Sequence, residues 1–467
     1  MLTENFGDEI MQDIDKLLKE VKRVHFIGIG GSGMCPLAEI LFNEGYELSG
    51  SDNNETDTLA RIRNMGIPVV LGQKAENIKG AEMIVYTAAL LPDNPELVAA
   101  KESGIPTFER ADLLGAVTRM YSNCCCVCGT HGKTTVSSML TQIMIQCGKD
   151  PSAVIGGKLP LIQSNGRVGQ TENIVCEACE FKDTFLHLSP DVAVILNVDA
   201  DHLEYFKNIE NIIKSFNKFS IMATKALIVN GDDANSLKAI EGVTGKDIIY
   251  FGKDKKNDFY ADNIEIANAF PRFDIFKNGE KVGSVNLKVP GEHNIYNALA
   301  ALTAADYNGI PMADAISSLE QFGGACRRFE VLAKTHGLTI ADDYAHHPAE
   351  LKVTLEAAMQ MGYNRVWAVF QPFTYSRTKK LMDDFAKVLQ IPDRCVMTEI
   401  MGSREVNTEG VYTSQLAEKI PGSVWFNTFD QVADYVLSNA EEGDLIITLG
   451  CGDIYKAAKL MIQKLDK

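Results

Sequence analysis

The segment with the clearest chemical meaning is "GTHGKTT", which runs from Gly129 to Thr135. It follows the apolar stretch "CCCVC" and precedes the helical pattern "VSSMLTQIMIQCG", so strand, loop and helix come in the order of a phosphate-binding loop. Small residues let backbone N–H groups face phosphate oxygens, and the start of the helix adds positive potential. We expect Lys133 to reach the β/γ-phosphates of a nucleotide and Thr134 to ligate magnesium. The loop is a shortened variant, because Val127 stands where the full pattern has glycine.

The cysteines before this loop could instead form a metal or redox site. Cys125 and Cys128 make one C-x-x-C pair and Cys176 and Cys179 another, which together could supply four thiolates to zinc. On a strand, however, alternate residues face opposite ways, so Cys125 and Cys128 would point apart. We interpret the run as a buried strand packed with small apolar residues, and redox and metal roles stay open.

Polar groups also end the next two predicted strands. Glu177 closes "NIVCEA", and His202 follows "VAVILNVDADH". In an open parallel sheet, ligands bind beyond the carboxyl ends of the strands, so these groups should meet the phosphate loop. We therefore predict Lys133, Glu177 and His202 as catalytic residues, and Thr134, Glu177 and His202 as magnesium ligands with room for two ions. A solvated glutamate and a capping histidine are the simpler alternatives.

A second glycine motif lies near the N-terminus. Gly28, Gly30 and Gly33 have the G-x-G-x-x-G spacing after the strand "VHFI", and Asp52 ends the next predicted strand. This pattern is typical of dinucleotide-binding units, but other nucleotides and plain packing remain open for so short a motif.

The elements that must position these residues follow from the whole chain. Its 467 residues, 46% of them hydrophobic, predict several domains, and short β-branched runs alternating with helical patterns predict an α/β fold with parallel sheets. Domain boundaries are expected near residues 115–123 and 322–330.

Charge and composition narrow the possible binding partners and the expected cellular location. The net charge of −17 argues against nucleic acid and anionic membranes as partners. Because neither a signal peptide nor an apolar run of about 18 residues is evident, we expect a cytoplasmic protein without membrane insertion, whose 11 cysteines are free thiols.

Several motifs occur in one order along nearly the whole chain beyond residue 22. They are "GIGGSGM" (28–34), "SGSD" (49–52), "GTHGKTT" (129–135), "DADHLEYF" (199–206), "GEHNIYNALAA" (291–301), "RRFE" (327–330), "DDYAHHPAE" (342–350), "QPFTYSRT" (371–378) and "LGCGDIY" (449–455). In this respect the chain resembles the Mur ligases, and "DDYAHHP" is similar to the branch that acts on UDP-N-acetylmuramate itself.

The resemblance implies three α/β domains. Residues 22–118 would be a Rossmann-like domain for the UDP-sugar, 119–324 a central P-loop ATPase domain with a parallel sheet, and 325–467 a Rossmann-like domain for the amino acid. Residues 1–21 would be a helical extension.

The resemblance also assigns residues to three ligands. Those for the UDP-sugar are Gly28, Gly30, Gly31, Ser32, Gly33, Met34, Ser51, Asp52 and Arg110. Those for ATP are Gly129, Thr130, His131, Gly132, Lys133, Thr134, Thr135, Asn294, Asn297, Arg327 and Asp343. Those for the amino acid are Tyr344, His346, His347 and Arg377. His346 and Arg377 also join the catalytic set, and either His346 or His347 would accept the proton of the amine.

The implied reaction joins L-alanine to the lactyl carboxylate of UDP-N-acetylmuramate through an acyl phosphate, using ATP and two Mg²⁺ ions, in peptidoglycan precursor synthesis. The expected protein is a monomer or weak homodimer. Three alternatives remain open: a ligase of the same family that attaches a preformed peptide, an NAD-dependent oxidoreductase and a non-catalytic nucleotide-binding regulator.

Four positions depart from the family pattern. Cys179 replaces an acid, Thr374 an arginine, Gln73 a histidine and Cys451 an alanine.

Overall fold

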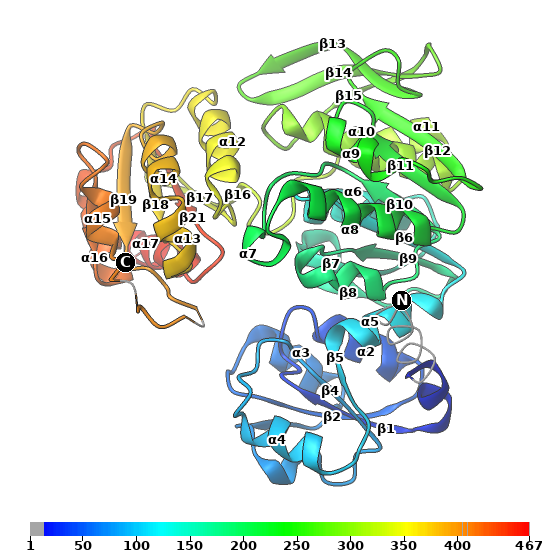
Figure 1. The fold of residues 1–467 in the computed structure, drawn as a ribbon. Helices are drawn as coiled ribbons and strands as arrows, with labels where there is room; N and C mark the ends of the chain where they lie inside the picture. Colours follow the sequence, from blue (N-terminus) through cyan, green and yellow to red (C-terminus); the bar gives the residue numbers. More distant parts are fainter. Residues whose placement is uncertain (1–13, 404, 409, 467) are drawn as a thin grey trace. The chain divides into compact units, whose positions relative to one another are not determined.

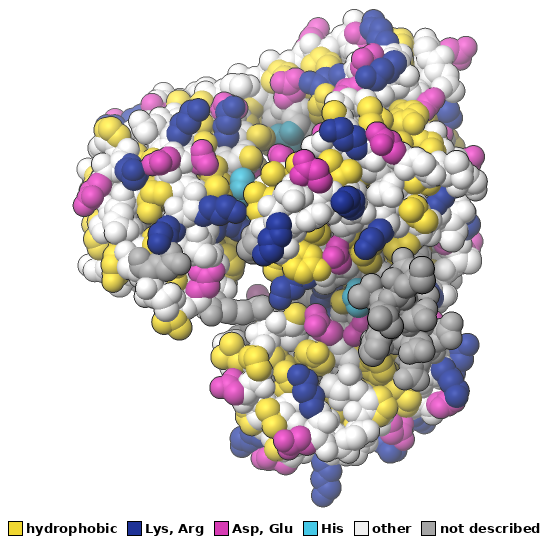
Figure 2. Space-filling view, in the orientation of Figure 1, with side chains coloured by type: hydrophobic (Ala, Val, Ile, Leu, Met, Phe, Trp, Pro, Cys, Tyr) yellow, Lys and Arg dark blue, Asp and Glu magenta, His cyan; other side chains and the backbone are white. Residues whose placement is uncertain are grey.

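The computed structural model describes residues 14–403, 405–408 and 410–466, which form three sheets of five, ten and six strands with helices against them (Figure 1). The predicted α/β fold is confirmed. On the face drawn in Figure 2, acidic and basic side chains are interspersed. Within the described ranges, none of the helices combines the length and apolarity needed to span a bilayer.

The five-stranded sheet is wholly parallel and has the strand order β3-β2-β1-β4-β5. Its strands are β1 (Arg23–Ile27), β2 (Glu47–Asp52), β3 (Val69–Leu71), β4 (Met83–Tyr86) and β5 (Thr107–Glu109). The intervening segments form α2 (Cys35–Asn43), α3 (Asp57–Asn64), η1 (Ala75–Ile78) and α4 (Pro95–Glu102), and α5 (Arg110–Arg119) follows β5. This order places the turn after β1 at the edge of the sheet where nucleotides bind in such folds.

The ten-stranded sheet has the order β15-β14-β13-β12-β11-β10-β6-β9-β7-β8. Its strands are β6 (Asn123–Cys128), β7 (Ser152–Leu159), β8 (Ser164–Arg167), β9 (Asn173–Glu177), β10 (Val192–Ile195), β11 (Ala226–Asn230), β12 (Asp247–Gly252), β13 (Phe259–Ala267), β14 (Phe270–Lys277) and β15 (Glu280–Asn286). Its helices are α6 (Lys133–Gln146), η2 (Pro160–Ile162), η3 (Phe181–His187), α7 (Leu203–Phe206), α8 (Ile209–Met222), α9 (Ala234–Ala239), α10 (His293–Tyr307) and α11 (Met312–Leu319).

This sheet is mixed, not parallel throughout as the sequence led us to expect. Strands β6, β9, β10, β11 and β12 pair in parallel, but β7 and β8 form an antiparallel hairpin at one edge. The central strands are apolar runs buried on both faces, whereas the hairpin strands carry glycine and polar residues that suit an edge.

The six-stranded sheet has the order β16-β17-β21-β18-β19-β20, with only its edge strand β16 antiparallel to its neighbour. Its strands are β16 (Glu330–Thr335), β17 (Leu338–Asp343), β18 (Val366–Phe370), β19 (Arg394–Thr398), β20 (Val424–Phe426) and β21 (Leu445–Leu449). Its helices are α12 (Pro348–Met359), α13 (Tyr375–Lys380), α14 (Met382–Val388), α15 (Thr413–Ala417), α16 (Phe429–Asn439) and α17 (Tyr455–Leu465).

The chain divides into two compact units. The first runs through Asp262 and adds Ile275–Gly283 and Tyr296–Leu319, and the second consists of Asn263–Asp274, Ser284–Ile295 and Glu320–Lys467. Each has its own buried core. The domain boundaries expected from the sequence stay a prediction.

The expected N-terminal extension is described only from residue 14, so its first 13 residues lie outside the described part. Residues 14–20 are helical, and Ile14 and Leu18 are buried in the core of the first unit. The Asp15 carboxylate accepts two hydrogen bonds from Arg119, at 2.6 and 2.8 Å, so this helix is fixed by packing and by charge.

Candidate active site

The phosphate loop lies between β6 and α6, as the sequence predicts. Gly129 and Gly132 have φ angles of 146° and 86°, a backbone conformation that favours glycine. A Cβ atom on Gly132 would lie 2.5 Å from Oδ1 of Asn297, and one on Gly129 would lie 2.9 Å from Cβ of Leu196. Helix α6 begins at Lys133 and has 14 residues, so its first N–H groups and its dipole face the loop.

The Lys133 ammonium is held at the base of this loop. Its Nζ donates to the carbonyl oxygens of Gly129 (2.5 Å) and Thr130 (3.0 Å) and lies 2.9 Å from Oε2 of Glu180. Burial alone lowers the pKa of Lys133, but the adjacent Glu180 carboxylate outweighs it and raises the pKa. The lysine is therefore a permanent positive charge. Glu180 itself was not assigned a role from the sequence.

Glu177 lies at the end of β9, where its carboxylate faces α6. Its Oε1 accepts from the Thr134 hydroxyl (3.0 Å), and its Oε2 accepts from the backbone N–H of Gly156 (2.7 Å) and from the Ser137 hydroxyl (3.4 Å). The sequence did not indicate Gly156 or Ser137, because β7 approaches Glu177 only through the sheet register.

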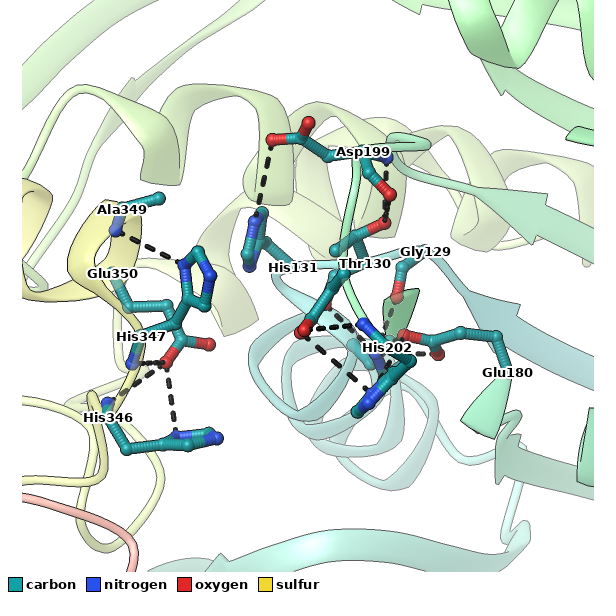
Figure 3. Close-up of polar contacts among 12 residues, drawn as sticks. Gly129, Thr130, His131, Glu180, Asp199, His202, His346, His347, Ala349 and Glu350 are labelled. Atoms are coloured by element: carbon teal, nitrogen blue, oxygen red, sulfur yellow. Dashed lines mark hydrogen bonds and ion pairs between the residues drawn. The ribbon is translucent and has the colours of Figure 1, made fainter. Parts of the chain in front are cut away.

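His202 follows β10 and has a φ of 52°. Its Nε2 lies 4.0 Å from Oε1 of Glu180 (Figure 3). The carboxyl ends of the adjacent strands β10, β6 and β9 thus bring together the predicted residues Lys133, Thr134, Glu177 and His202.

The donor set fits magnesium when phosphate oxygens complete the shell. Mg²⁺ prefers oxygen ligands and is usually bound through one or two carboxylates plus phosphates and waters. Thr134 and Glu177 offer a hydroxyl and a carboxylate 3.0 Å apart. Over the described residues, no group of three or more His, Cys, Asp or Glu side chains could hold a metal ion by itself.

The cysteines of β6 are buried free thiols. Cys124, Cys126 and Cys128 pack into one core cluster that excludes Cys125, so Cys125 and Cys128 face opposite ways as expected. Burial raises the pKa of Cys125 and of Cys128, which keeps both thiols protonated. They have the environment of packing residues, not of metal ligands.

The turn after β1 is built on the backbone of β2. The N–H groups of Gly28 and Ile29 donate to the carbonyl of Ser51 at 2.8 and 3.0 Å, and that of Gly30 donates to Asp52 at 3.0 Å. The other predicted residues of this site, Gly31, Ser32, Gly33 and Met34, continue the turn into α2, and a Cβ atom on Gly33 would lie 3.0 Å from Cδ of Arg110.

Glu96, to which the sequence assigned no role, is fully buried beneath this turn. Its carboxylate accepts from the Ser51 hydroxyl and from Nε2 of His25, both at 2.7 Å, and from Asn77 at 3.1 Å. The departure at Gln73 has a local role, because its Oε1 accepts from the amides of Asn53 (2.9 Å) and Asn94 (2.6 Å).

In the second unit, Arg327 is fixed from four sides. Its Nε donates to Asp342 (2.8 Å), its Nη2 donates to the Gly450 carbonyl (2.7 Å), and its guanidinium lies 4.9 Å from the ring centroids of both Tyr344 and Tyr455. Asp342 is buried and was not singled out from the sequence.

The neighbouring Asp343 holds the backbone around it. Its carboxylate accepts from the N–H groups of Phe329 and Ala345, both at 2.7 Å. Burial nevertheless raises the pKa of Asp343 to about 6. A contact of this side chain with a ribose stays a prediction.

Two predicted histidines directly precede α12 (Figure 3). Nδ1 of His346 lies 3.1 Å from the Tyr344 carbonyl and 3.2 Å from Oε2 of Glu350. Nδ1 of His347 accepts from the N–H of Ala349 at 3.3 Å and so caps the helix.

Arg377 lies on α13, and the departure at Thr374 caps that helix, since its Oγ1 accepts from the N–H of Arg377 at 3.4 Å. Of the two asparagines of α10, Asn297 belongs to the first unit and lies against Gly132. Asn294 belongs to the second unit, where it donates to the Pro290 carbonyl at 2.7 Å.

Comparison with known proteins gives three family matches along the chain. The description "Mur ligase family, catalytic domain" matches residues 23–122, "Mur ligase middle domain" matches 127–305, and "Mur ligase, glutamate ligase domain" matches 327–452. A UDP-N-acetylmuramate–L-alanine ligase of Acetivibrio thermocellus is 43% identical over 95% of this chain and 96% of its own length. The chain belongs to the Mur ligase family.

Further relatives agree with this assignment. A UDP-N-acetylmuramate–L-alanine ligase of Caldanaerobacter subterraneus subsp. tengcongensis is 41% identical over 96% of this chain and 99% of its own length. The crystal structure of UDP-N-acetylmuramate–alanine ligase from Thermotoga maritima superposes with a TM-score of 0.81 at 27% identity, covering 95% of this chain and 99% of the other. Membership makes the chain an ATP-dependent, amide-bond-forming ligase, and the oxidoreductase and regulator alternatives lose their support.

Proposed function

We propose that this Mur ligase joins L-alanine to the lactyl carboxylate of UDP-N-acetylmuramate in peptidoglycan precursor synthesis. The observation that carries the proposal is the identity of 41 to 43%, over nearly the whole chain, with ligases of that name. The loop, Glu177 and His202 support it, because they form a nucleotide phosphate site in which an acid could be activated.

The chemistry begins with a carboxylate, which does not condense with an amine because its oxygen is a poor leaving group. A lactyl carboxylate oxygen would attack the γ-phosphorus of ATP, forming an acyl phosphate and releasing ADP. The amine nitrogen of L-alanine would then attack the acyl carbon, phosphate would leave, and the amine would lose a proton.

Charge stabilisation is the main task of the first unit, because both reactants are anions. The Lys133 ammonium and the start of α6 would offset negative charge on the phosphates. Thr134 and Glu177 would hold Mg²⁺, which when bound neutralises charge on phosphate oxygens. We propose that a second Mg²⁺ ion binds near His202, which makes two ions in all.

The hydrogen bonds of the histidines favour His346 as the base. Both neighbours of its Nδ1, the Tyr344 carbonyl and the Glu350 carboxylate, are acceptors, so Nδ1 carries the proton and Nε2 keeps its lone pair. The carboxylate would also stabilise the imidazolium that forms. Nδ1 of His347 accepts a hydrogen bond, so its neutral ring carries the proton on Nε2.

The competing activity is attachment of a preformed peptide to the same sugar. A murein peptide ligase from Psychrobacter arcticus has a similar fold, with a TM-score of 0.75, but at 23% identity it supports only the fold.

The test is phosphate release from ATP, Mg²⁺ and UDP-N-acetylmuramate with L-alanine, glycine, L-serine or the tripeptide added in turn. We expect the fastest release with L-alanine, and none above background for Lys133→Ala, which should still fold but unfold at a lower midpoint because Glu180 loses its cation. Release with the tripeptide but not with L-alanine would refute the proposed acceptor. Near-normal turnover of Lys133→Ala would refute the phosphate-loop assignment.

The remaining expectations stay predictions. They are a cytoplasmic location, a monomer or weak homodimer, and the boundaries of the four segments.

A further inference from the structure

The phosphate loop of this enzyme lacks the residue that begins the full pattern. Val127, which stands in place of that glycine, lies inside β6, paired with Val194 of β10 and Glu177 of β9, and is fully buried. The loop is therefore only the four residues from Gly129 to Gly132 before α6 starts. So short a loop has few internal contacts, and its shape must be set from outside.

The outside support comes from the segment after β10. The side-chain amide of Asn197 forms two hydrogen bonds with the backbone of His131: its Oδ1 accepts from the His131 N–H (2.8 Å), and its Nδ2 donates to the His131 carbonyl (3.1 Å). The Asn197 carbonyl also accepts from the N–H of Thr130 (3.0 Å). One asparagine thus fixes three consecutive peptide groups of the loop.

Its neighbours add to the same support. The N–H of Asp199 donates to the Thr130 hydroxyl at 2.8 Å (Figure 3). Leu196 lies directly under the loop, because a Cβ atom on Gly129 would be only 2.9 Å from the Cβ atom of Leu196. The segment from Leu196 to Asp199 thus packs against the loop and forms hydrogen bonds with it.

The segment from Leu196 to Asp199 is itself held by side chains from the end of β11 and the start of α9. Asn230 donates to the Leu196 carbonyl (2.9 Å), Asp233 accepts from the Val198 N–H (3.1 Å), and Asn235 donates to the Val198 carbonyl (3.0 Å). The backbone on both sides of Asn197 is therefore fixed before any ligand arrives, which lowers the entropy lost when the ligand binds.

We propose that Asn197 is a positioning residue for ATP, acting through the backbone of His131 to hold the shortened loop in its phosphate-binding shape. The inference rests on the proposed function only in taking ATP as the ligand of this loop. Asn197 lies in the segment after β10, the strand next to β6, and supplies the rigidity that a longer loop would have.

Binding of MgATP alone, measured by calorimetry without the other substrates, tests the proposal in Asn197→Ala, Asn197→Asp and a control. Asn217→Ala is the matched control, because the Asn217 amide also donates two backbone hydrogen bonds, to the carbonyls of Ala239 and Glu241 (3.1 Å each), on a helix that the loop does not use. We expect Asn197→Ala to weaken MgATP binding about tenfold or more, whereas Asn217→Ala leaves it unchanged.

Asn197→Asp separates the two halves of the contact. Its carboxylate can accept from the His131 N–H but cannot donate to the His131 carbonyl, so binding should again be weakened at least tenfold. In turnover assays the KM for ATP should rise while the KM for L-alanine stays constant, and the shift in unfolding temperature caused by MgATP should shrink.

Three results would overturn the proposal: unchanged MgATP binding in Asn197→Ala, wild-type binding in Asn197→Asp, or equal losses in Asn217→Ala. Because binding is measured without ligation, its outcome does not depend on which amine the enzyme accepts. A wrong acceptor would leave these results unchanged.

Discussion

Replacement of Gly156 by alanine should displace the Glu177 carboxylate, which we propose as a magnesium ligand. A Cβ atom on Gly156 would lie 2.4 Å from Oε1, 2.6 Å from Oε2 and 2.7 Å from Cδ of Glu177, whereas ordinary contact begins at 3.4 Å. The carboxylate would therefore have to move by about 1 Å, and its 2.7 Å hydrogen bond from the Gly156 N–H would be lost or distorted. The backbone at Gly156 does not have a left-handed φ, so alanine introduces no further strain.

The size of the effect follows from the two changes. A hydrogen bond to a charged group contributes about 1.5–3 kcal/mol, and a displacement of about 1 Å in a catalytic group can lower a rate about 100-fold. We expect kcat/KM for Gly156→Ala to fall about 100-fold, and the Mg²⁺ concentration for half-maximal rate to rise about tenfold. The free energy of unfolding should fall as well, by up to about 1.5–3 kcal/mol, because the same hydrogen bond stabilises the folded state.

The assay is phosphate release at saturating ATP, UDP-N-acetylmuramate and L-alanine over a series of Mg²⁺ concentrations. Gly323→Ala is the matched control, since a Cβ atom on Gly323 would meet nothing within 4 Å. A Gly156→Ala enzyme with a rate within threefold of wild type would refute the argument that the position of Glu177 matters. A lowered rate with an unchanged Mg²⁺ dependence would refute its role as a metal ligand.

Three further predictions concern the loop, Asp343 and the thiols. Gly132→Ala should raise the KM for ATP at least tenfold in steady-state assays, because its Cβ would lie 2.5 Å from Oδ1 of Asn297 at a φ of 86°; an unchanged KM would contradict the loop geometry. Burial raises the pKa of Asp343 from 3.8 to about 6, so its contribution to stability is full below about pH 3.8 and is lost as pH rises through about 6. The free energy of unfolding of the wild type, relative to Asp343→Asn, should therefore fall by about 2 kcal/mol between pH 4 and pH 8 in denaturant titrations, and a constant difference would be evidence against the raised pKa. Iodoacetamide should label the exposed Cys179 well before the buried Cys128 in peptide mass spectra, and the opposite order would show that β6 opens.

Much of the candidate site could be predicted because its signals are local. The spacing of glycines around Lys133 reports a backbone shape, and the rule that parallel strands end at one edge placed Glu177 and His202 with it. The sequence offers no such signal for Gly156 or Asn197. Each meets its partner across the sheet, 21 residues from Glu177 for Gly156 and 66 from His131 for Asn197, so its role depends on strand register and not on spacing.

The fold, too, could be predicted only where its sequence signals are local. Apolar, β-branched runs such as β10 and β11 are buried on both faces, so they could be recognised as parallel strands. The hairpin of β7 and β8 has few such residues and is stabilised by pairing with its neighbours, which is why the sheet was expected to be parallel throughout.

The departure from the family pattern at Cys179 becomes understandable from its two neighbours. The Glu177 carboxylate turns toward Thr134 and Gly156, and that of Glu180 turns toward Lys133 at 2.9 Å, while Cys179 between them is exposed. The acids on either side of the replaced position therefore supply both carboxylates at the base of the phosphate loop. Replacing the intervening acid with cysteine leaves the balance at Lys133 intact, because the partner that raises the pKa of this lysine most is Glu180. A short polar motif can thus lose one acid without losing the charge arrangement on which the proposed phosphate binding depends.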